Sequence, residues 1–499
     1  MKANSKKGRN ERCTTGIEGL DDILGGGLPR NRLYLVQGDP GAGKTTLALQ
    51  FLLEGVKQGE TGLYITLSET REELEVVADS HGWSLDKLNL FELSTIEAQV
   101  NRETESTFFH PSEVELNRTV TAMLEEAKRV KPMRLVLDSL SELRLLAETS
   151  LRYRRQILQL KQYFAGLNCT VLLLDDCSGG SRDLQVESTA HGVISLHRVS
   201  PDYGISRRNL NVVKLRGVKF REGNHDFIIQ RGGLEIFPRL IAAEHHVPFK
   251  RDSFPSGISE LDELLGGGLD RGTSTMFMGP PGTGKSTIAM KFALSAAKKK
   301  EKSIVFLFDE TTGTLMNRAR KLNMDIEPHV KNGTIHLEQV DPAELSPGEL
   351  TSRIRRAVIG NKTRIVIIDS INGYLNAMPA ENYLNLQLHE LLSYLNQMGV
   401  ITIMVLAQQG LVGAMQTTVD LTYLSDTVIL LRYFEAKGTV KQALSVIKKR
   451  SGNHERSIRE LAIDKSGISL SEPLVSMQGI LTGTPVFHEA KGAPVLKPK

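Results

Sequence analysis

Cysteine, tryptophan and long apolar runs are all scarce in this chain of 499 residues. None of its three cysteines, Cys13, Cys169 and Cys177, stands at the C-x-x-C spacing typical of zinc and redox sites. So few cysteines, odd in number, argue against a disulfide framework and indicate a reducing compartment, so we expect a cytoplasmic protein. No apolar run approaches the roughly 20 residues of a membrane span, and the N-terminus lacks the apolar core of a secretory signal.

A large excess of one charge is also missing. The chain has 62 Lys and Arg against 58 Asp and Glu. This excess is too small for a chain of this length to indicate nucleic acid as the partner. Part of it lies near the N-terminus, in Lys2, Lys6, Lys7, Arg9 and Arg12. We expect flexible, solvated tails at residues 1–13 and 486–499, in preference to a DNA-binding arm.

One motif occurs twice. The pattern G-x-x-x-x-G-K-[ST] is found at residues 38–45 and again at residues 279–286. In this pattern the glycines let backbone N–H groups close on the β-phosphate, the Lys ammonium meets the β- and γ-phosphates, and the hydroxyl holds Mg²⁺. We therefore predict two sites for ATP and Mg²⁺. The residues expected at ATP are Gly38, Asp39, Pro40, Gly41, Ala42, Gly43, Lys44, Thr45 and Thr46, and Gly279, Pro280, Pro281, Gly282, Thr283, Gly284, Lys285, Ser286 and Thr287.

The motif belongs to a longer internal repeat. Lys285 follows Lys44 by 241 positions, and Glu310 follows Glu69 by the same number. A duplicated domain explains this register. We predict domains at residues 14–245 and 246–485, each large enough for its own core. We interpret the histidine pair at residues 245–246 as part of a linker, because no further His or Cys stands at metal-ligand spacing.

Each motif lies between an apolar run and a helical pattern, as a phosphate-binding loop requires. Residues 33–37 predict a strand and residues 45–56 a helix, and residues 275–278 and 286–297 repeat the pair. Further apolar runs end in polar residues while helical patterns intervene. This order predicts an α/β fold in which a mostly parallel sheet is flanked by helices and binds ligands at the carboxyl ends of its strands.

Carboxylates at the ends of these runs are candidates for chemistry. Glu69 and Glu310 are the candidate catalytic residues, because each is predicted to end the strand beside the phosphate-loop strand, within reach of a γ-phosphate. Two aspartates that end apolar strands, together with the loop hydroxyls, are predicted to form the Mg²⁺ shell. The predicted Mg²⁺ ligands are Thr45, Asp138, Ser286, Asp369 and Glu310.

A basic triplet recurs near the end of each half, after an alternating strand pattern. Such charges can protect a strand edge against pairing, or they can contact phosphate. Recurrence in two nucleotide-binding domains favours phosphate contact, and in ring-shaped ATPases such residues reach the neighbour's site as arginine fingers. The triplets therefore predict an oligomer. Their residues are Lys214, Leu215 and Arg216, and Lys448, Lys449 and Arg450.

These residues together resemble the KaiC family, from residue 14 to about residue 485. The resemblance rests on both loops, the repeated [TS]-G-I-x-x-L-D opening with G-G-G-L, and residues 67–70, 80–83, 214–217 and 425–427. It implies two tandem RecA-like P-loop NTPase domains and a homo-hexamer of two stacked rings with ATP at subunit interfaces. It also implies that Glu69 and Glu310 are catalytic and that the triplets contact the adjacent subunit's ATP.

The resemblance further implies a slow ATPase in the first domain and, as in clock members, a serine/threonine autokinase in the second. Where those members have adjacent Ser and Thr acceptors, this chain has Thr422 and Tyr423. The phenol would displace the acceptor oxygen by several ångströms, so we predict Thr422 as the phosphoacceptor and no ordered two-site cycle. Ser68 replaces a glutamate of the family's first site, and Gln442 matches Arg208, so the two sites are expected to differ. A KaiB-like or other signalling protein is the expected partner.

Two other functions stay open. A RecA-type nucleic-acid-dependent ATPase shares this core, and the Arg-Tyr-Arg-Arg cluster at residues 152–155 is the best evidence for it. It would need a basic channel or an accessory domain, and the sequence has no helix-hairpin-helix or zinc module. A nucleotide-gated scaffold without catalysis is the other alternative, and the intact residues of both sites weigh against it: Lys44, Lys285, Asp138, Asp369, Glu69 and Glu310. We therefore predict an ATPase with autokinase activity and expect no nucleic-acid or membrane partner.

Overall fold

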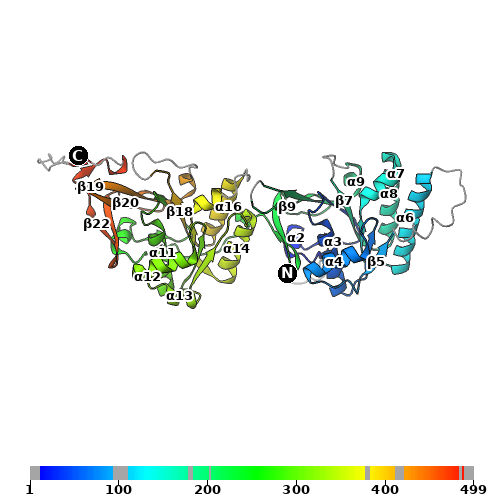
Figure 1. Cartoon of the computed structure of the whole chain (residues 1–499), viewed down its shortest axis with the longest axis horizontal. Helices are drawn as coiled ribbons and strands as arrows, with labels where there is room; N and C mark the ends of the chain where they lie inside the picture. The colour runs from blue at the N-terminus through cyan, green and yellow to red at the C-terminus, as the bar shows by residue number, and fades with distance from the viewer. Residues whose placement is uncertain are drawn as a thin grey trace. The chain divides into compact units, whose positions relative to one another are not determined.

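The chain divides into two compact units, Met1–Arg239 and Leu240–Lys499. The computed structural model describes residues 12–93, 111–177, 184–201, 204–376, 383–410, 421–482 and 486–487. Each unit has a nine-stranded sheet between two layers of helices (Figure 1). This arrangement confirms the predicted α/β fold with a mostly parallel sheet in each half.

The sheet of the first unit has the strand order β11-β10-β9-β8-β3-β7-β6-β4-β5. The strands from β8 to β5 in this order run parallel, whereas β8 to β11 pair antiparallel. The central strands β3, β4 and β6 are buried along their whole length, because helices cover both faces. The strands are β3 (Leu33–Gly38), β4 (Gly62–Thr66), β5 (Asn89–Glu92), β6 (Arg134–Asp138), β7 (Thr170–Asp176), β8 (Gly192–Val199), β9 (Arg207–Leu215), β10 (Asn224–Gln230) and β11 (Gly233–Phe237).

Two apolar clusters cover the faces of this sheet. Helices α2, α3 and α4 pack on one face, and α6, α7, α8 and α9 pack on the other. The helices are α2 (Glu18–Ile23), α3 (Lys44–Lys57), α4 (Arg71–His81), α6 (Pro111–Val130), α7 (Leu140–Ala147), α8 (Ser150–Gly166) and α9 (Leu184–Thr189). A separate two-stranded sheet pairs β1 (Arg12–Cys13) with β2 (Leu28–Pro29).

The second unit repeats this plan with the strand order β16-β15-β17-β18-β14-β19-β20-β21-β22. Its strands are β14 (Ser274–Gly279), β15 (Lys302–Leu307), β16 (Ile335–Gln339), β17 (Thr363–Asp369), β18 (Ile401–Ala407), β19 (Thr427–Ala436), β20 (Thr439–Lys449), β21 (Ile458–Asp464) and β22 (Gly467–Pro473). Two small sheets pair β12 (Ser253–Phe254) with β13 (Leu269–Asp270) and β23 (Met477–Gln478) with β24 (Val486–Phe487).

Helices of the second unit also form two layers. α10 (Ser259–Leu264), α11 (Lys285–Lys298), α12 (Thr312–Lys321) and α13 (Glu327–Lys331) pack on one face. The other face is covered by α14 (Pro347–Gly360), α15 (Ile371–Asn376) and α16 (Leu384–Gln397). The short turns η1 (Ala242–Glu244), η2 (Thr422–Leu424) and η3 (Ile480–Thr482) complete the described elements. In the described ranges no helix is both long and apolar enough to cross a bilayer.

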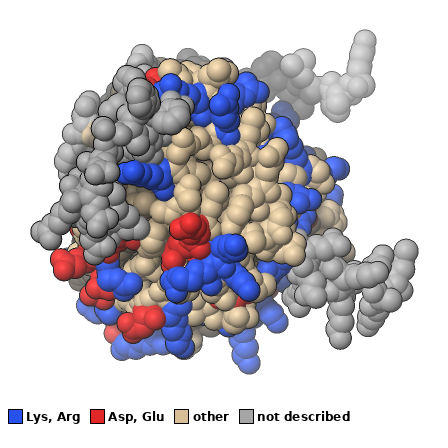
Figure 2. Space-filling view, turned by 90° about the vertical axis from the view of Figure 1, so that its right-hand side faces the viewer, with Lys and Arg blue, Asp and Glu red and all other residues tan. Residues whose placement is uncertain are grey.

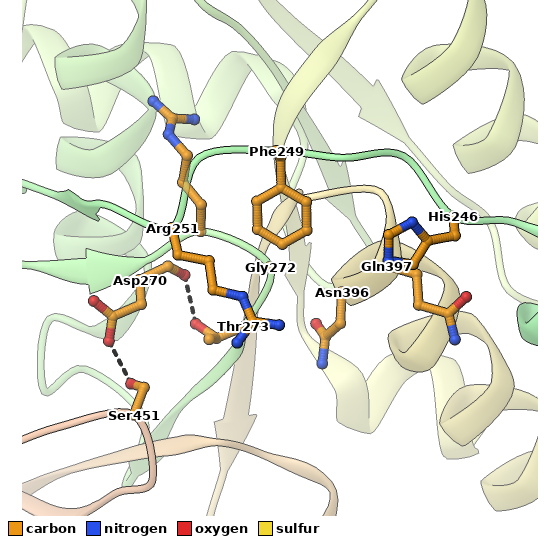
Figure 3. A pocket seen from close by; sticks show the side chains of 10 residues that line it. His246, Phe249, Arg251, Asp270, Gly272, Thr273, Asn396, Gln397 and Ser451 are labelled. Atoms are coloured by element: carbon orange, nitrogen blue, oxygen red, sulfur yellow. Dashed lines mark hydrogen bonds between the residues drawn. The ribbon is translucent and has the colours of Figure 1, made fainter.

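The boundary between the units lies six residues before the expected position after residue 245. Leu240 and Ala242 are buried in the core of the second unit, and the Ala242 N–H donates to Glu390 Oε2 at 3.2 Å. Farther along, a Cβ at Gly272 or Gly399 would come within 2.4 or 2.5 Å of the Phe249 ring. Figure 3 shows this ring beside Gly272, at the edge of a cavity of about 450 Å³. The segment that was expected to link the domains is therefore packed on the second one.

A buried histidine makes the first unit sensitive to acid. His225 is 0 % exposed. Its Nδ1 accepts from the Arg239 N–H at 2.8 Å, so its Nε2 carries the proton toward the Arg221 carbonyl oxygen, 3.0 Å away. Burial, with Arg221 and Arg239 nearby, lowers the pKa of His225 to about 4. Because one ring nitrogen accepts a hydrogen bond and the other donates one, these contacts require the neutral ring.

We predict that the first unit loses stability as pH falls from 6.5 toward 4. The pKa of His225 is lower in the folded state than in the unfolded chain, so its stabilising effect is present above pH 6.5 and is lost in acid, by about 3 kcal/mol. The single Trp, Trp83, lies in this unit, so its fluorescence can follow urea unfolding at pH 7 and pH 4.5. His225→Gln, which keeps one donor and one acceptor, should flatten this pH dependence; an equal slope in both proteins would contradict the assignment.

Candidate functional site

Each phosphate loop joins a buried strand to a helix. Gly43 has φ 109° and Gly284 has φ 93°, in the left-handed region that glycine tolerates. Each of them immediately precedes the helix of its domain, so α3 begins at Lys44 and α11 at Lys285. The backbone N–H groups of a helix N-terminus point outward and favour an anion. Both loops thus have the conformation that the motif predicts.

The two loop lysines have different partners. Lys44 Nζ donates to the carbonyl oxygens of Gly38 and Asp39, at 2.9 and 3.0 Å, and forms an ion pair with Asp176 Oδ1 at 2.6 Å. Lys285 Nζ donates to the carbonyl oxygens of Gly279 and Pro280, at 2.8 and 2.6 Å. Burial lowers the pKa of Lys285 to about 8. Burial thus disfavours the charged form of Lys285, and an anion bound at the second loop would favour it.

The predicted Mg²⁺ residues lie together in each domain. Thr45 Oγ1 is 3.4 Å from Asp138 Oδ2, and the Tyr64 hydroxyl donates to the same oxygen at 2.5 Å. Asp369 of the second domain is buried, with Ser286 as a hydrogen-bond partner. Burial raises the pKa of both aspartates. A hydroxyl and a carboxylate side by side fit Mg²⁺, which keeps several waters and takes substrate phosphates as its other ligands.

Glu69 lies near this group, but its strand is not the neighbour that we expected. β4 is separated from β3 by β6 and β7, since the strand order is β3-β7-β6-β4. The same correction applies to Glu310, because β17 and β18 lie between β15 and β14. The carboxyl ends of these parallel strands still meet at one edge. Burial, followed by the charges of Asp138, Glu73 and Asp176, raises the pKa of Glu69 to about 7. Its Oε2 is buried with no hydrogen-bond partner among the described residues.

Glu310 has a different environment. Its Oε1 accepts from Arg318 Nη1 at 2.8 Å, and Val77 takes the place of this arginine in the first half of the repeat. The neighbouring Asp309 accepts a hydrogen bond from the Ser370 hydroxyl. The candidate catalytic carboxylate is thus ion-paired in the second domain, whereas Glu69 has no ion pair among the residues that the structure describes.

Side chains from the antiparallel part of each sheet reach the loops. The Gln442 amide donates to the Gly282 carbonyl oxygen at 3.2 Å, and the Tyr433 hydroxyl donates to that of Pro281 at 3.3 Å. In the first domain the paired residues at these positions are Arg208 and Arg198. The first loop therefore has two cations nearby where the second has neutral groups. The sequence comparison identified the Arg208 and Gln442 pair but missed Arg198 and Tyr433.

Each basic triplet lies at the opposite end of its sheet from the phosphate loop of the same domain. Leu215 pairs with Gly192, and Gly192 with Tyr34 near the start of β3. This position is about 13 Å along the strand from Gly38. The Arg216 guanidinium donates to the Ser188 carbonyl oxygen at 2.8 Å, and Lys214 Nζ donates to that of Glu187.

The second triplet has the equivalent position, since Lys449 pairs with Thr427 and Thr427 with Thr275. Lys448 Nζ donates to the carbonyl oxygens of Thr422 and Ser425. The Lys449 side chain is only 3 % exposed and pairs with Asp270 at 3.3 Å. Lys449, like the buried Leu215, therefore has only its backbone available for a nucleotide.

Thr422 lies in η2 beside this triplet and lines a cavity of about 330 Å³. Its neighbours there include Gln408, Arg432 and Lys448. Tyr423 is 57 % exposed. Because η2 precedes β19, whose first residue is level with the start of β14, Thr422 lies at the opposite end of the strand from the loop of its own domain.

The cluster at residues 152–155 does not form a surface on which bases could stack. Tyr153 is buried, and the Arg144 guanidinium lies 5.3 Å from the centre of its ring. Arg152 pairs with Glu148 at 3.6 Å. On the face of the molecule that Figure 2 shows, basic and acidic side chains of the described residues surround an uncharged area instead of forming one basic band.

Besides Arg198 and Tyr433, the sequence analysis missed three functional neighbours. These are Tyr64, which bonds Asp138, Arg318, which pairs with Glu310, and Asp176, which pairs with Lys44. Asp176 had a visible signal, because it ends a predicted strand at the edge where ligands bind. Tyr64 and Arg318 lie inside a strand and a helix, where nothing in the pattern distinguishes them from packing or solvent-facing residues.

Comparison with known proteins identifies the family. The family model for the KaiC ATPase matches residues 13–241 and 254–475. The chain is 27 % identical over 493 residues to the circadian clock oscillator protein KaiC of Parathermosynechococcus lividus, covering 94 % of this chain and 87 % of that protein. It is 26 % identical over 483 residues to the circadian clock protein KaiC3 of Synechocystis, covering 96 % and 95 %. For KaiC of Synechococcus elongatus the identity is 27 % over 496 residues, covering 97 % and 93 %.

The family model matches two tandem segments, and each contains one phosphate loop with its lysine, hydroxyl, aspartate and glutamate. The two nine-stranded, mostly parallel sheets are the RecA-like domains that these segments form. The chain therefore belongs to the KaiC family of ATPases.

Proposed function

We propose that this protein hydrolyses ATP at both loops, assembles as a homo-hexamer and transfers phosphate to Thr422. The observation that carries the ATPase is the convergence of a loop lysine, a hydroxyl and an aspartate at the helix N-terminus of each domain, with a glutamate close by. Thr45 with Asp138, and Ser286 with Asp369, would hold Mg²⁺, which would supply positive charge against the charge that develops on the phosphates. The chain's own residues would bind and orient the nucleotide.

Glu69 and Glu310 are proposed to orient the attacking group and to take its proton. A carboxyl with a pKa of about 7 is well matched to proton transfer at neutral pH, which supports this role for Glu69. Glu310 accepts a hydrogen bond from the Arg318 guanidinium through one of its oxygens, and this contact restrains the orientation of the carboxylate. The two domains would then catalyse the same type of reaction, with carboxylates in different electrostatic environments.

The positions of the triplets support an oligomer. Lys214 and Arg216 lie about 13 Å along the sheet from their own loop, so phosphate contact would have to occur in another subunit. The same holds for Lys448 and Arg450. Each domain would thus offer a loop at one end and a basic triplet at the other, and a closed ring would bring the two ends together. A KaiB-like or other signalling protein is the proposed partner of this assembly.

Thr422 is the proposed acceptor, and its phosphate would come from a neighbouring subunit, because its own loop lies at the other end of β14. Gln408, Arg432 and Lys448 line the same cavity, and cations stabilise an added phosphate. Tyr423 beside it is exposed but carries its oxygen at the end of a long ring. A reaction that needs close alignment would therefore favour the threonine.

We predict that Glu69→Gln and Glu310→Gln each remove most of the ATP hydrolysis of their own domain. Loss of a positioned base costs about 10²- to 10⁴-fold, so the double variant should release almost no phosphate. The matched control is Glu72→Gln, an exposed carboxylate of the first turn of α4, which should keep the original rate. If the double variant hydrolyses ATP at the unchanged rate, the glutamates have no part in the reaction and a nucleotide-gated scaffold becomes the better description.

We predict that ATP-dependent assembly requires the triplets. Lys214→Ala with Arg216→Ala should shift the protein from a hexamer toward smaller species in size-exclusion chromatography with light scattering, in the presence of ATP and Mg²⁺. Lys219→Ala, an exposed lysine after the same strand, serves as the control. A variant that assembles as well as the control would refute the proposed contact between subunits.

We predict one added phosphate on Thr422 after incubation with ATP. Intact-mass and peptide mass spectrometry over several hours should show a gain that Thr422→Ala abolishes and Tyr423→Phe leaves in place. Lys285→Ala should also abolish the gain, because the nucleotide of the second domain supplies the phosphate. Label that persists in Thr422→Ala would show that another residue is the acceptor.

A further inference from the structure

The phosphate-binding lysine of the first domain already has an acidic partner. Lys44 Nζ lies 2.6 Å from Asp176 Oδ1, and its other hydrogen bonds go to the carbonyl oxygens of Gly38 and Asp39. An ammonium group has three N–H donors, and these three contacts use all of them. The Lys44 side chain is only 9 % exposed, so water screens the pair weakly.

The second domain lacks this carboxylate. Asp176 is the last residue of β7 and pairs with Gly38, while Ala407, the last residue of β18, pairs with Gly279 in the same register. Lys285 donates to the two matching carbonyl oxygens, of Gly279 and Pro280. No ion pair of Lys285 occurs among the residues that the structure describes. The two loops therefore differ in one respect: the lysine of the first loop has a carboxylate partner at the end of the neighbouring strand, and the lysine of the second has an alanine at that position.

A phosphate and Asp176 would compete for the same N–H donor. A nucleotide that takes Lys44 must displace the carboxylate, and the displaced negative charge then lies beside the phosphates unless its side chain turns away. Asp176 has room to turn, since its side chain is 33 % exposed. Hydrogen bonds between charged groups contribute more than neutral ones, so the competition is large enough to measure.

We infer that Asp176 competes with nucleotide for Lys44 and thereby lowers the affinity of the first site for nucleotide. At the matching position the second site has Ala407, which cannot compete. This inference rests on the proposed nucleotide binding. Arg198 and Arg208 lie near the first loop, and they add positive charge that acts in the opposite direction. Asp176 therefore lowers the affinity of its own loop whichever of the two sites binds nucleotide more tightly.

The test measures each site separately in the full-length chain. Lys285→Ala silences the second site, and the fluorescent methylanthraniloyl derivative of the non-hydrolysable β,γ-imido ATP, with Mg²⁺, reports on the first. Asp176→Asn, which keeps the size of the side chain but removes its charge, should lower the Kd about tenfold or more. The gain should change little with salt concentration, because ions screen a largely buried pair weakly.

A neighbouring carboxylate provides the matched control. Asp175 pairs with Arg144 and accepts from the Ser141 hydroxyl at 3.1 Å. Asp175→Asn changes the net charge equally at the adjacent position and should change the Kd less than about twofold, on the scale of a distant charge. In the reverse experiment, Lys44→Ala silences the first site, and Ala407→Asp should raise the Kd of the second about tenfold.

The outcomes separate the inference from the proposed function. If Asp176→Asn binds with unchanged or weaker affinity while Lys44→Ala abolishes first-site binding, nucleotide binding stands and the inference is overturned. If the unmodified chain binds the probe at neither loop, both fail. Thermal unfolding of each variant, followed by circular dichroism, shows whether it is folded. Tighter binding in Asp176→Asn together with weaker binding in Ala407→Asp supports the counterion role.

Discussion

The parallel pairing of the loop strand with its neighbour is the constraint on which both sites depend. In the first domain Gly38 is level with Asp176, and in the second Gly279 is level with Ala407. Parallel strands bring their carboxyl ends to one edge of the sheet, so the residue that ends the neighbouring strand lies beside the loop lysine. A single substitution at that strand end can therefore change the charge beside the lysine while the backbone stays the same.

The duplicated domains have diverged through such substitutions. The first site concentrates carboxylates: Asp176 pairs with Lys44, and the charges of Asp138 and Asp176 help to raise the pKa of Glu69. The second site replaces Asp176 by an alanine and gives its glutamate Arg318 as a partner. Each change alters the electrostatic surroundings of a group that would face phosphate, and none requires a different fold. The two domains therefore share one fold but differ in the charges around their loop lysine and their glutamate.

The sequence predicted the parts of the structure that depend on local pattern. Both loops, their strands and their helices occur where the apolar runs and the motif indicated, and each loop hydroxyl lies beside the aspartate that was expected near it. It failed where the answer depends on which strands become neighbours. Glu69 was expected on the strand next to β3, yet two strands intervene, because crossover connections place strands in an order different from that of the chain. The Tyr64 contact with Asp138 and the packing of residues 240–245 on the second unit depend on the same long-range assembly.

Each domain has a polarity that keeps its own basic triplet away from its own phosphate loop. The loop and its carboxylates lie at the carboxyl ends of the parallel strands, whereas the basic triplet and, in the second domain, Thr422 lie at the other end. Two unlike surfaces on one body form a head-to-tail contact, which either closes into a ring or continues as a filament. Because the two domains are covalently joined and equal in number, a closed ring of the first would have to contain as many subunits as a ring of the second. In such an assembly, the affinity of the first loop for nucleotide, which Asp176 would lower, would affect whether the ring closes and whether the proposed acceptor Thr422 would reach a phosphate donor.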